Sequence, residues 1–166
     1  MEQNFIGISE NRLRHMIGVA RKAYKIAKDM GCDENFARKM FMVGWIHDVG
    51  YEFSEKQSDH SKVSSELLHQ LVCCHEIYDT PVSLKTNHAI CYHGLYPDES
   101  IEHNLEWKII NMADMLVDNK GNEVTASKRL EDIKNRYGEH SDQYLTACDI
   151  CQRIGLTAEN FAANVT

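Results

Sequence analysis

The chain has 166 residues, 43% of them hydrophobic and only 2 of them proline, so its composition favours one ordered globular domain with a sizeable core. The net charge of -7 argues against nucleic acid polymers and acidic membranes as main partners. It does not exclude a small phosphate ligand, because a bound metal ion can invert the local charge. No apolar run approaches the roughly 20 residues of a membrane span, and the first residues do not form a secretory signal. We therefore expect a cytoplasmic protein.

Helical periodicity begins almost at the start of the chain. Ser9 is predicted to cap a first helix that ends near Gly31, and Asp33 to cap a second that runs to about Gly50. A left-handed glycine at position 50 would stop this second helix. In the first helix, His15 lies on an apolar stripe and is expected to point inward. The second helix carries one apolar row that continues to His47, directly before Asp48; its other members are Phe36, Met40 and Val43.

The rest of the chain also reads as helices. Asp59, Ser83 and Asn104 are predicted to cap the next three, and the helix after Asn104 places Asp114 in an apolar row. Further helices are predicted from the segments "TASKRLEDIKNRYG", "SDQYLTACDICQRIG" and "TAENFAANV". No strand alternation of useful length and no linker is present. The fold class is therefore predicted to be all-α, with about six to eight helices in a single domain over 1–166, its core at about 9–120 and its C-terminal helices at 121–166.

Ionisable groups on three of these apolar stripes need an explanation. They are His15, His47 with Asp48, and Asp114. A buried carboxylate is costly unless it is paired or binds a metal ion, and no Lys or Arg interrupts the stripes of His47 and Asp114. Any one histidine on an apolar face is more often a satisfied core residue, and Asp114 alone could be a buried cap acceptor. Together these residues favour a divalent metal site. Imidazole and carboxylate ligands suit Mn, Fe, Co, Ni or Zn better than Mg.

The order H…HD…D, carried by "RLRHMIGVA", "VGWIHDVGY" and "IINMADMLVD", resembles the HD superfamily of metal-dependent phosphohydrolases. The resemblance implies the all-helical HD fold, with His15, His47, Asp48 and Asp114 as metal ligands. Members with two metals have two further histidines between the His-Asp pair and the last Asp, and His60 and His93 match that order. The resemblance therefore implies one or two divalent metal ions.

Three segments, "HSKVSSELL", "AICYHG" and "LEWKIINMADML", are similar to the branch that splits diadenosine tetraphosphate symmetrically. That branch has Pro-Gly-Arg just after the last motif, where this chain reads "DNKGNE"; Lys120 could replace the lost positive charge. The expected activity is hydrolysis of a small phosphorylated substrate, a nucleotide or dinucleotide. Asp48 would bridge the metals and orient the nucleophile, and Lys62 or Arg14 would counter charge on the phosphoryl oxygens.

Two other functions remain open on the sequence. Some HD proteins with the same six ligand positions resemble di-iron oxygenases, and a non-catalytic nucleotide sensor would bind its ligand without turnover. The oligomeric state is also open, a homo-oligomer included. The remaining histidines are expected to be surface or satisfied interior residues: His69, His75, His88, His103 and His140. The C-x-x-C pair Cys148 and Cys151 lacks the extra ligands of a zinc site and the βαβ context of a redox site, which favours free structural thiols.

Overall fold

The computed structural model describes residues 8–74 and 84–156, and within these ranges it contains seven α-helices and no strand. The helices are α1 (Glu10–Asp29), α2 (Glu34–Ile46), α3 (His60–Cys74), α4 (Leu84–Cys91), α5 (Leu105–Met115), α6 (Ala126–Tyr137) and α7 (Asp142–Arg153). Three short 3-10 helices lie between them: η1 (Val49–Glu52), η2 (Gln57–Asp59) and η3 (Glu99–His103). The predicted all-α class is confirmed. The predicted cap Ser83 and the predicted helix from Thr157 lie outside the described residues.

Side-chain caps explain where several helices begin. The hydroxyl of Ser9 accepts a hydrogen bond from the backbone N–H of Arg12, 3.2 Å away. Asp33, Asn104 and Ser141 cap α2, α5 and α7 in the same way, as predicted. Each cap satisfies one of the N–H groups that lack a partner in the first turn of a helix.

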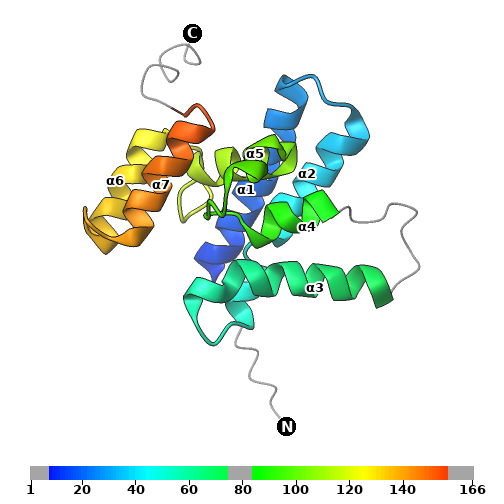
Figure 1. The fold of residues 1–166 in the computed structure, drawn as a ribbon, viewed down its shortest axis with the longest axis horizontal. Helices are drawn as coiled ribbons and strands as arrows, with labels where there is room; N and C mark the ends of the chain where they lie inside the picture. Colours follow the sequence, from blue (N-terminus) through cyan, green and yellow to red (C-terminus); the bar gives the residue numbers. More distant parts are fainter. Residues whose placement is uncertain (1–7, 75–83, 157–166) are drawn as a thin grey trace.

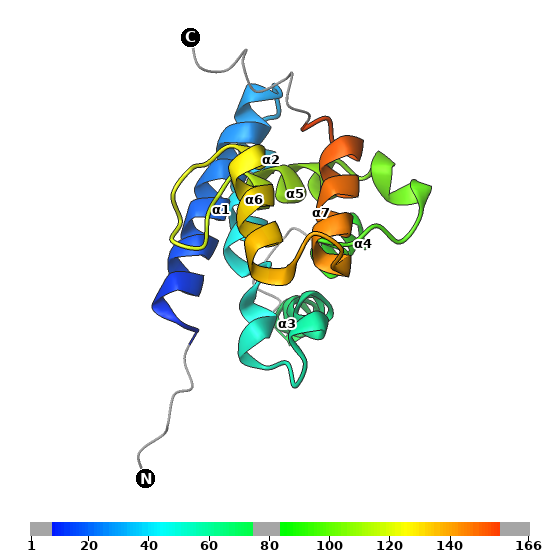
Figure 2. The same ribbon diagram turned by 90° about the vertical axis from the view of Figure 1, so that its left-hand side faces the viewer.

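The helices are arranged around α5. α1 and α2 form an antiparallel pair, α5 packs on both, and α3 lies across one end of the pair beside α4 (Figure 1). Figure 2 shows α6 and α7 side by side, where they form a hairpin that packs on α5. None of the described helices combines the length and the apolar character needed to cross a bilayer.

Two apolar clusters hold this arrangement. The larger joins α1, α2, α4 and α5 through buried side chains that include Val19, Met40, Ile90, Trp107 and Ile110. The smaller joins α6 and α7 to the end of α5 through Met115, Ala126, Ile133, Ala147 and Cys151. The indole N–H of Trp107 donates to the carbonyl oxygen of Tyr92 at 2.9 Å, which fixes the turn after α4 against α5. Burying these side chains is the main favourable term in folding.

The end of α2 differs from the prediction. The helix ends at Ile46 with His47 as its C-cap, whereas helical structure was predicted to about Gly50. Gly50 does not have the predicted positive φ angle. It is required for a different reason, because a Cβ atom there would lie 2.0 Å from the carbonyl oxygen of His60. Gly50 therefore allows the turn after α2 to touch the first turn of α3.

Replacing Gly50 with alanine is expected to lower the free energy of unfolding by at least about 3 kcal/mol, because the new Cβ would meet rigid backbone rather than a movable side chain. Urea denaturation followed by circular dichroism measures this change. Gly155→Ala is the matched control, since a Cβ there meets nothing within 4 Å and the φ of +77° alone costs about 1–2 kcal/mol. Equal losses in the two variants would show that the close approach does not matter.

Candidate metal centre

The structure brings all six predicted ligand residues together around the carboxylate of Asp48. They come from every part of the main helical core: His15 from α1, His47 and Asp48 from the end of α2, His60 from the first turn of α3, His93 from the turn after α4, and Asp114 from α5. The backbone of Asp48 has φ -105° and ψ 4°. This conformation is sparsely populated and recurs at active sites. A cluster assembled from five separate segments depends on the whole fold.

One oxygen of Asp48 faces three imidazoles. Its Oδ1 lies 3.4 Å from Nε2 of His47, 3.5 Å from Nε2 of His60 and 3.1 Å from Nε2 of His93. The Nε2 atoms of His60 and His93 are 3.2 Å apart. Asp48, His60 and His93 thus offer three ligand atoms close enough together to hold one ion.

The other oxygen of Asp48 faces α1. Its Oδ2 lies 3.8 Å from Nε2 of His15, which is in turn 3.0 Å from Oδ1 of Asp114. His15, His47 and Asp48 form a second group with ligand atoms close enough for one ion, and Asp114 adjoins it. Asp48 belongs to both groups, so its carboxylate could contribute a ligand atom to either.

Backbone carbonyl groups set the tautomer of three of these histidines. In each case Nδ1 donates to a carbonyl oxygen: His15 to Asp118 at 2.9 Å, His47 to Gly44 at 2.7 Å, and His93 to Ile90 at 2.7 Å. A carbonyl oxygen can only accept, so Nδ1 carries the hydrogen. The Nε2 atom of each ring therefore faces the centre, and in a neutral ring this atom carries the lone pair that a metal-binding histidine uses.

Two of these lone pairs have no partner in the protein. Nε2 of His15 and Nε2 of His47 are buried and make no hydrogen bond. Unpaired buried polar atoms are rare in proteins and are expected where an ion or ligand binds. A divalent cation satisfies both nitrogens and the carboxylates, so the residues present fit a metal ion.

The ionisation of these groups suits metal binding. Burial lowers the pKa of His47 to about 4, against the opposing charge of Asp48, so this imidazole is neutral at neutral pH. Burial acts to raise the pKa of Asp48, but the neighbouring imidazoles and Arg12 hold it well below its usual range. At Asp114, burial is likewise outweighed by the neighbouring imidazoles and Arg129, and the pKa is lowered. Both carboxylates are therefore charged.

Arg12 is a site residue that the sequence analysis missed. Its guanidinium forms an ion pair with Oδ2 of Asp48 and lies 3.9 Å from the centre of the Tyr51 ring. That ring stacks on His60 with centroids 3.9 Å apart and planes at 14°. Burial raises the pKa of Tyr51 to about 12, so the phenol stays neutral. The sequence did contain a signal for this contact. Arg12 precedes His15 by three residues and therefore lies on the same face of α1.

Arg129 of α6 is a second missed residue. Its Nη2 lies 3.5 Å from Oδ1 of Asp114, and its side chain is only 10% exposed. Nε and Nη1 are buried without a hydrogen-bond partner, although Nη1 lies 3.5 Å from Oδ2 of Asp132. The sequence offered no signal, because Arg129 belongs to an ordinary amphipathic helix that reaches Asp114 only through tertiary packing.

The centre lies close to the surface at one edge. The side chains of Arg12, Asp114 and His60 are 33%, 21% and 17% exposed, whereas that of Asp48 is 4% exposed. Solvent therefore reaches the edge of the centre at these three residues. The two cations expected from the sequence are exposed: Arg14 pairs with Glu10 at 2.5 Å, and Lys62 follows His60 by two residues. Their role toward a substrate stays a prediction.

Among the cysteines whose side chains the structure describes, the free thiols are Cys32, Cys91, Cys148 and Cys151. Burial raises the pKa of Cys151 to about 12, which keeps it protonated and unreactive.

The HD domain family matches residues 12–160, a range that contains all six residues of the centre. No curated protein and no solved structure matched the chain. Because the match covers most of the sequence and the structure has the all-helical fold with the His and Asp residues converging, this chain belongs to the HD domain family.

Proposed function

We propose that this protein is a metal-dependent phosphohydrolase that cleaves a phosphoester or phosphoanhydride bond of a nucleotide or dinucleotide. The HD domain places it in a superfamily of the metal-dependent phosphohydrolase type. The observation that carries the proposal is the pair of buried, unpartnered Nε2 atoms of His15 and His47 beside two charged carboxylates. A centre with these donors and a partly exposed edge can both hold cations and contact a phosphate.

Two cations are the arrangement that the geometry supports best. His15, His47, Asp48 and Asp114 would hold one, and the remaining pair of histidines, His60 and His93, would hold the other together with Asp48. Mixed imidazole and carboxylate donors suit Mn, Fe, Co, Ni or Zn, and suit Mg less well.

Each part of the centre has a role in the proposed hydrolysis. Divalent cations bound there would lower the pKa of a water molecule and offset the charge of phosphoryl oxygens. Asp48 orients the attacking water, whose oxygen forms the new bond to phosphorus as the bond to the leaving oxygen breaks. The leaving oxygen departs with its electron pair and takes up a proton. Arg12, half-buried beside Asp48 and packed on the Tyr51 ring, binds a phosphoryl oxygen, and Arg14 and Lys62 remain candidates for the outer phosphates.

A dinucleoside tetraphosphate is one candidate substrate, on the strength of the sequence segments similar to that branch. The segment 118–122 stands in place of Pro-Gly-Arg, and it forms a tight turn in which the Asp118 carboxylate accepts the backbone N–H groups of Lys120 and Asn122, at 2.8 and 2.9 Å. The carbonyl oxygen of Asp118 holds Nδ1 of His15. This turn thus orients His15, one of the proposed metal ligands. A contact between the turn and the substrate is part of the proposal.

The test is a hydrolysis panel with metal analysis of the untreated protein. Mononucleotides, nucleoside polyphosphates and dinucleoside polyphosphates are incubated with Mn, Fe, Co or Mg, and released phosphate and nucleotides are measured. Metal-dependent hydrolysis supports the proposal. Nucleotide binding without turnover would indicate a sensor, and oxygen uptake with a mixed-valent iron signal would indicate an oxygenase.

Replacing Arg12 with alanine is expected to raise KM for the best phosphate substrate about 10- to 100-fold, because a hydrogen bond to a charged group contributes about 1.5–3 kcal/mol. Arg12→Lys should recover part of this loss. Metal content is measured alongside, so that a lost phosphate contact is distinguished from a lost cation. Arg38→Ala, which removes an exposed arginine paired with Glu34 on α2, is the control. An unchanged KM in Arg12→Ala would remove Arg12 from the substrate contacts.

A further inference from the structure

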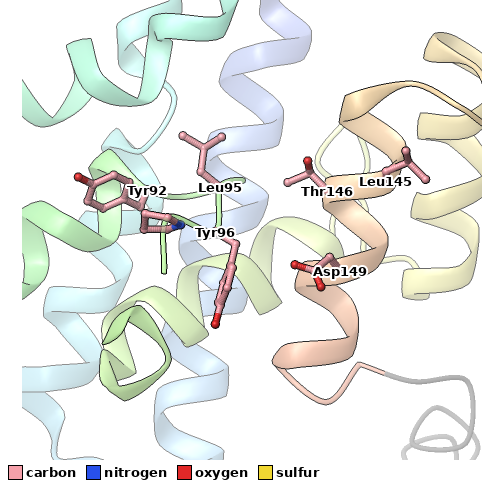
Figure 3. A pocket seen from close by; sticks show the side chains of 7 residues that line it. Tyr92, Leu95, Tyr96, Leu145, Thr146 and Asp149 are labelled. Atoms are coloured by element: carbon pink, nitrogen blue, oxygen red, sulfur yellow. The ribbon is translucent and has the colours of Figure 1, made fainter. Parts of the chain in front are cut away.

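A second feature of the molecule, outside the His and Asp cluster, is an open hollow of about 450 Å³ between the turn after α4 and helix α7. Figure 3 shows Thr146 and Asp149 of α7 pointing across it toward Leu95 and Tyr96. Its walls consist of Tyr92, Leu95, Tyr96, Pro97, Leu145, Thr146 and Asp149. This volume is within the roughly 300–1,000 Å³ typical of small-molecule sites.

The chemistry of these walls selects an uncharged ring. Tyrosine rings, leucines and a proline give an apolar surface suited to stacking, and the hydroxyl of Thr146 and the carboxylate of Asp149 supply a few polar contacts. Among the described residues, no lysine or arginine lines the hollow. The guanidinium of Arg153 lies beside the Tyr96 ring, but it is paired with Glu102 and Asp149. A phosphate group is therefore disfavoured here, whereas a planar ring with N–H donors finds both apolar side chains and acceptor oxygens.

The wall of the hollow is preorganised. The hydroxyl of Tyr96 donates to Oε1 of Glu102 at 2.7 Å, and the guanidinium of Arg153 lies 3.7 Å from the centre of the Tyr96 ring. Arg153 also donates to Oδ2 of Asp149 at 2.8 Å, which fixes that carboxylate. A rigid wall loses little conformational entropy when a ligand binds.

Both sides of the hollow are connected, through the chain or by packing, to residues next to the metal centre. Leu95 follows His93 by two residues, so its backbone is within about 7 Å of that ligand residue's backbone. The N–H of Gly94 between them donates to Oδ1 of Asn111 at 2.8 Å, one turn before Asp114 on α5. On the other side, α7 packs against Met115, the neighbour of Asp114, through Ala147 and Cys151.

From these observations we propose that the hollow binds the nucleobase of the substrate while its phosphate lies at the His and Asp centre. This inference rests on the proposed phosphohydrolase function and adds the part of the surface that would recognise the nucleobase. The uncharged end of a nucleotide then lies on apolar rings, and its charged end lies at the cations. Asp149 and Thr146 accept hydrogen bonds from base N–H groups.

The experiment compares a substrate that has a base with one that lacks it. The panel's best nucleotide substrate and p-nitrophenyl phosphate are assayed with metal-loaded wild type and with Leu95→Glu, which places a charge on the exposed wall of the hollow. The ratio of kcat/KM for the nucleotide to that for p-nitrophenyl phosphate is expected to fall at least about tenfold. Leu84→Glu, which changes an exposed leucine of α4 outside the hollow, is the matched control and should leave the ratio unchanged.

The outcomes separate this inference from the proposed function. An unchanged ratio in Leu95→Glu overturns the base site, and so does a wild type that hydrolyses p-nitrophenyl phosphate but no nucleotide; in both cases the phosphohydrolase stands. If wild type hydrolyses neither compound, the proposed function fails. Calorimetric titration with AMP, GMP, CMP and UMP then decides the base site alone: tighter binding by wild type than by Leu95→Glu supports it, and equal or absent binding overturns it.

Discussion

Replacing Asp48 with asparagine is expected to remove bound metal and phosphohydrolase activity together. The carboxylate of Asp48 touches both groups of ligand atoms, so its loss weakens both proposed metal positions. Loss of a hydrogen-bonding partner behind a ligand costs about 10- to 100-fold in metal affinity, and loss of the bridging ligand itself should cost more. Metal content by elemental analysis and hydrolysis rates, measured on the same preparation, give the result.

Asp29→Asn is the matched control, because Asp29 is an exposed aspartate at the end of α1. Circular dichroism establishes that both variants fold. His60→Ala extends the series and should leave one metal per chain in place of two, since the ligands around His15 remain. An Asp48→Asn variant that keeps its full metal content and activity would contradict the bridging role.

The second large effect is on thermal stability. Removal of metal with a chelator is expected to lower Tm substantially relative to protein with metal at 1,000 times its Kd. A ligand at that concentration stabilises the folded state by about 4 kcal/mol, which corresponds to about 8–16 °C for a chain of this size. The physical reason is that the unfolded chain does not hold the converging imidazoles and carboxylates, so the cation binds the folded state preferentially.

Differential scanning fluorimetry at several metal concentrations measures the shift. His47→Ala provides the comparison, because it removes one of the unpartnered buried nitrogens and should abolish most of the dependence on metal. Identical Tm values for wild type with chelator and with metal would mean that the centre does not bind the ion added.

Local signals explain which parts of the structure could be predicted from the sequence. Helix starts at Ser9, Asn104 and Ser141 follow from short-range hydrogen bonds between a side chain and an N–H two or three residues later. The inward orientation of His15 and His47 follows from the helical period, which places them on apolar stripes. These features depend on a few neighbouring residues, so the sequence carries them directly.

Some features that depend on contacts between distant segments were missed or wrong. Gly50 was expected to end a helix, but it is required by its approach to the backbone of His60, which a local pattern does not encode. Arg129 reaches Asp114 only because α6 packs on α5. The hollow beside Tyr96 likewise forms between a loop and α7, whose relative placement follows from the packed fold.

Anomalous X-ray scattering from crystals grown with Mn or Fe tests the central claim most directly, because it locates the ion without reference to activity. We expect one anomalous peak among His15, His47, Asp48 and Asp114, and a second among Asp48, His60 and His93. Crystals that hold the metal elsewhere, with Nε2 of His15 and Nε2 of His47 paired to water or protein donors, would contradict the account.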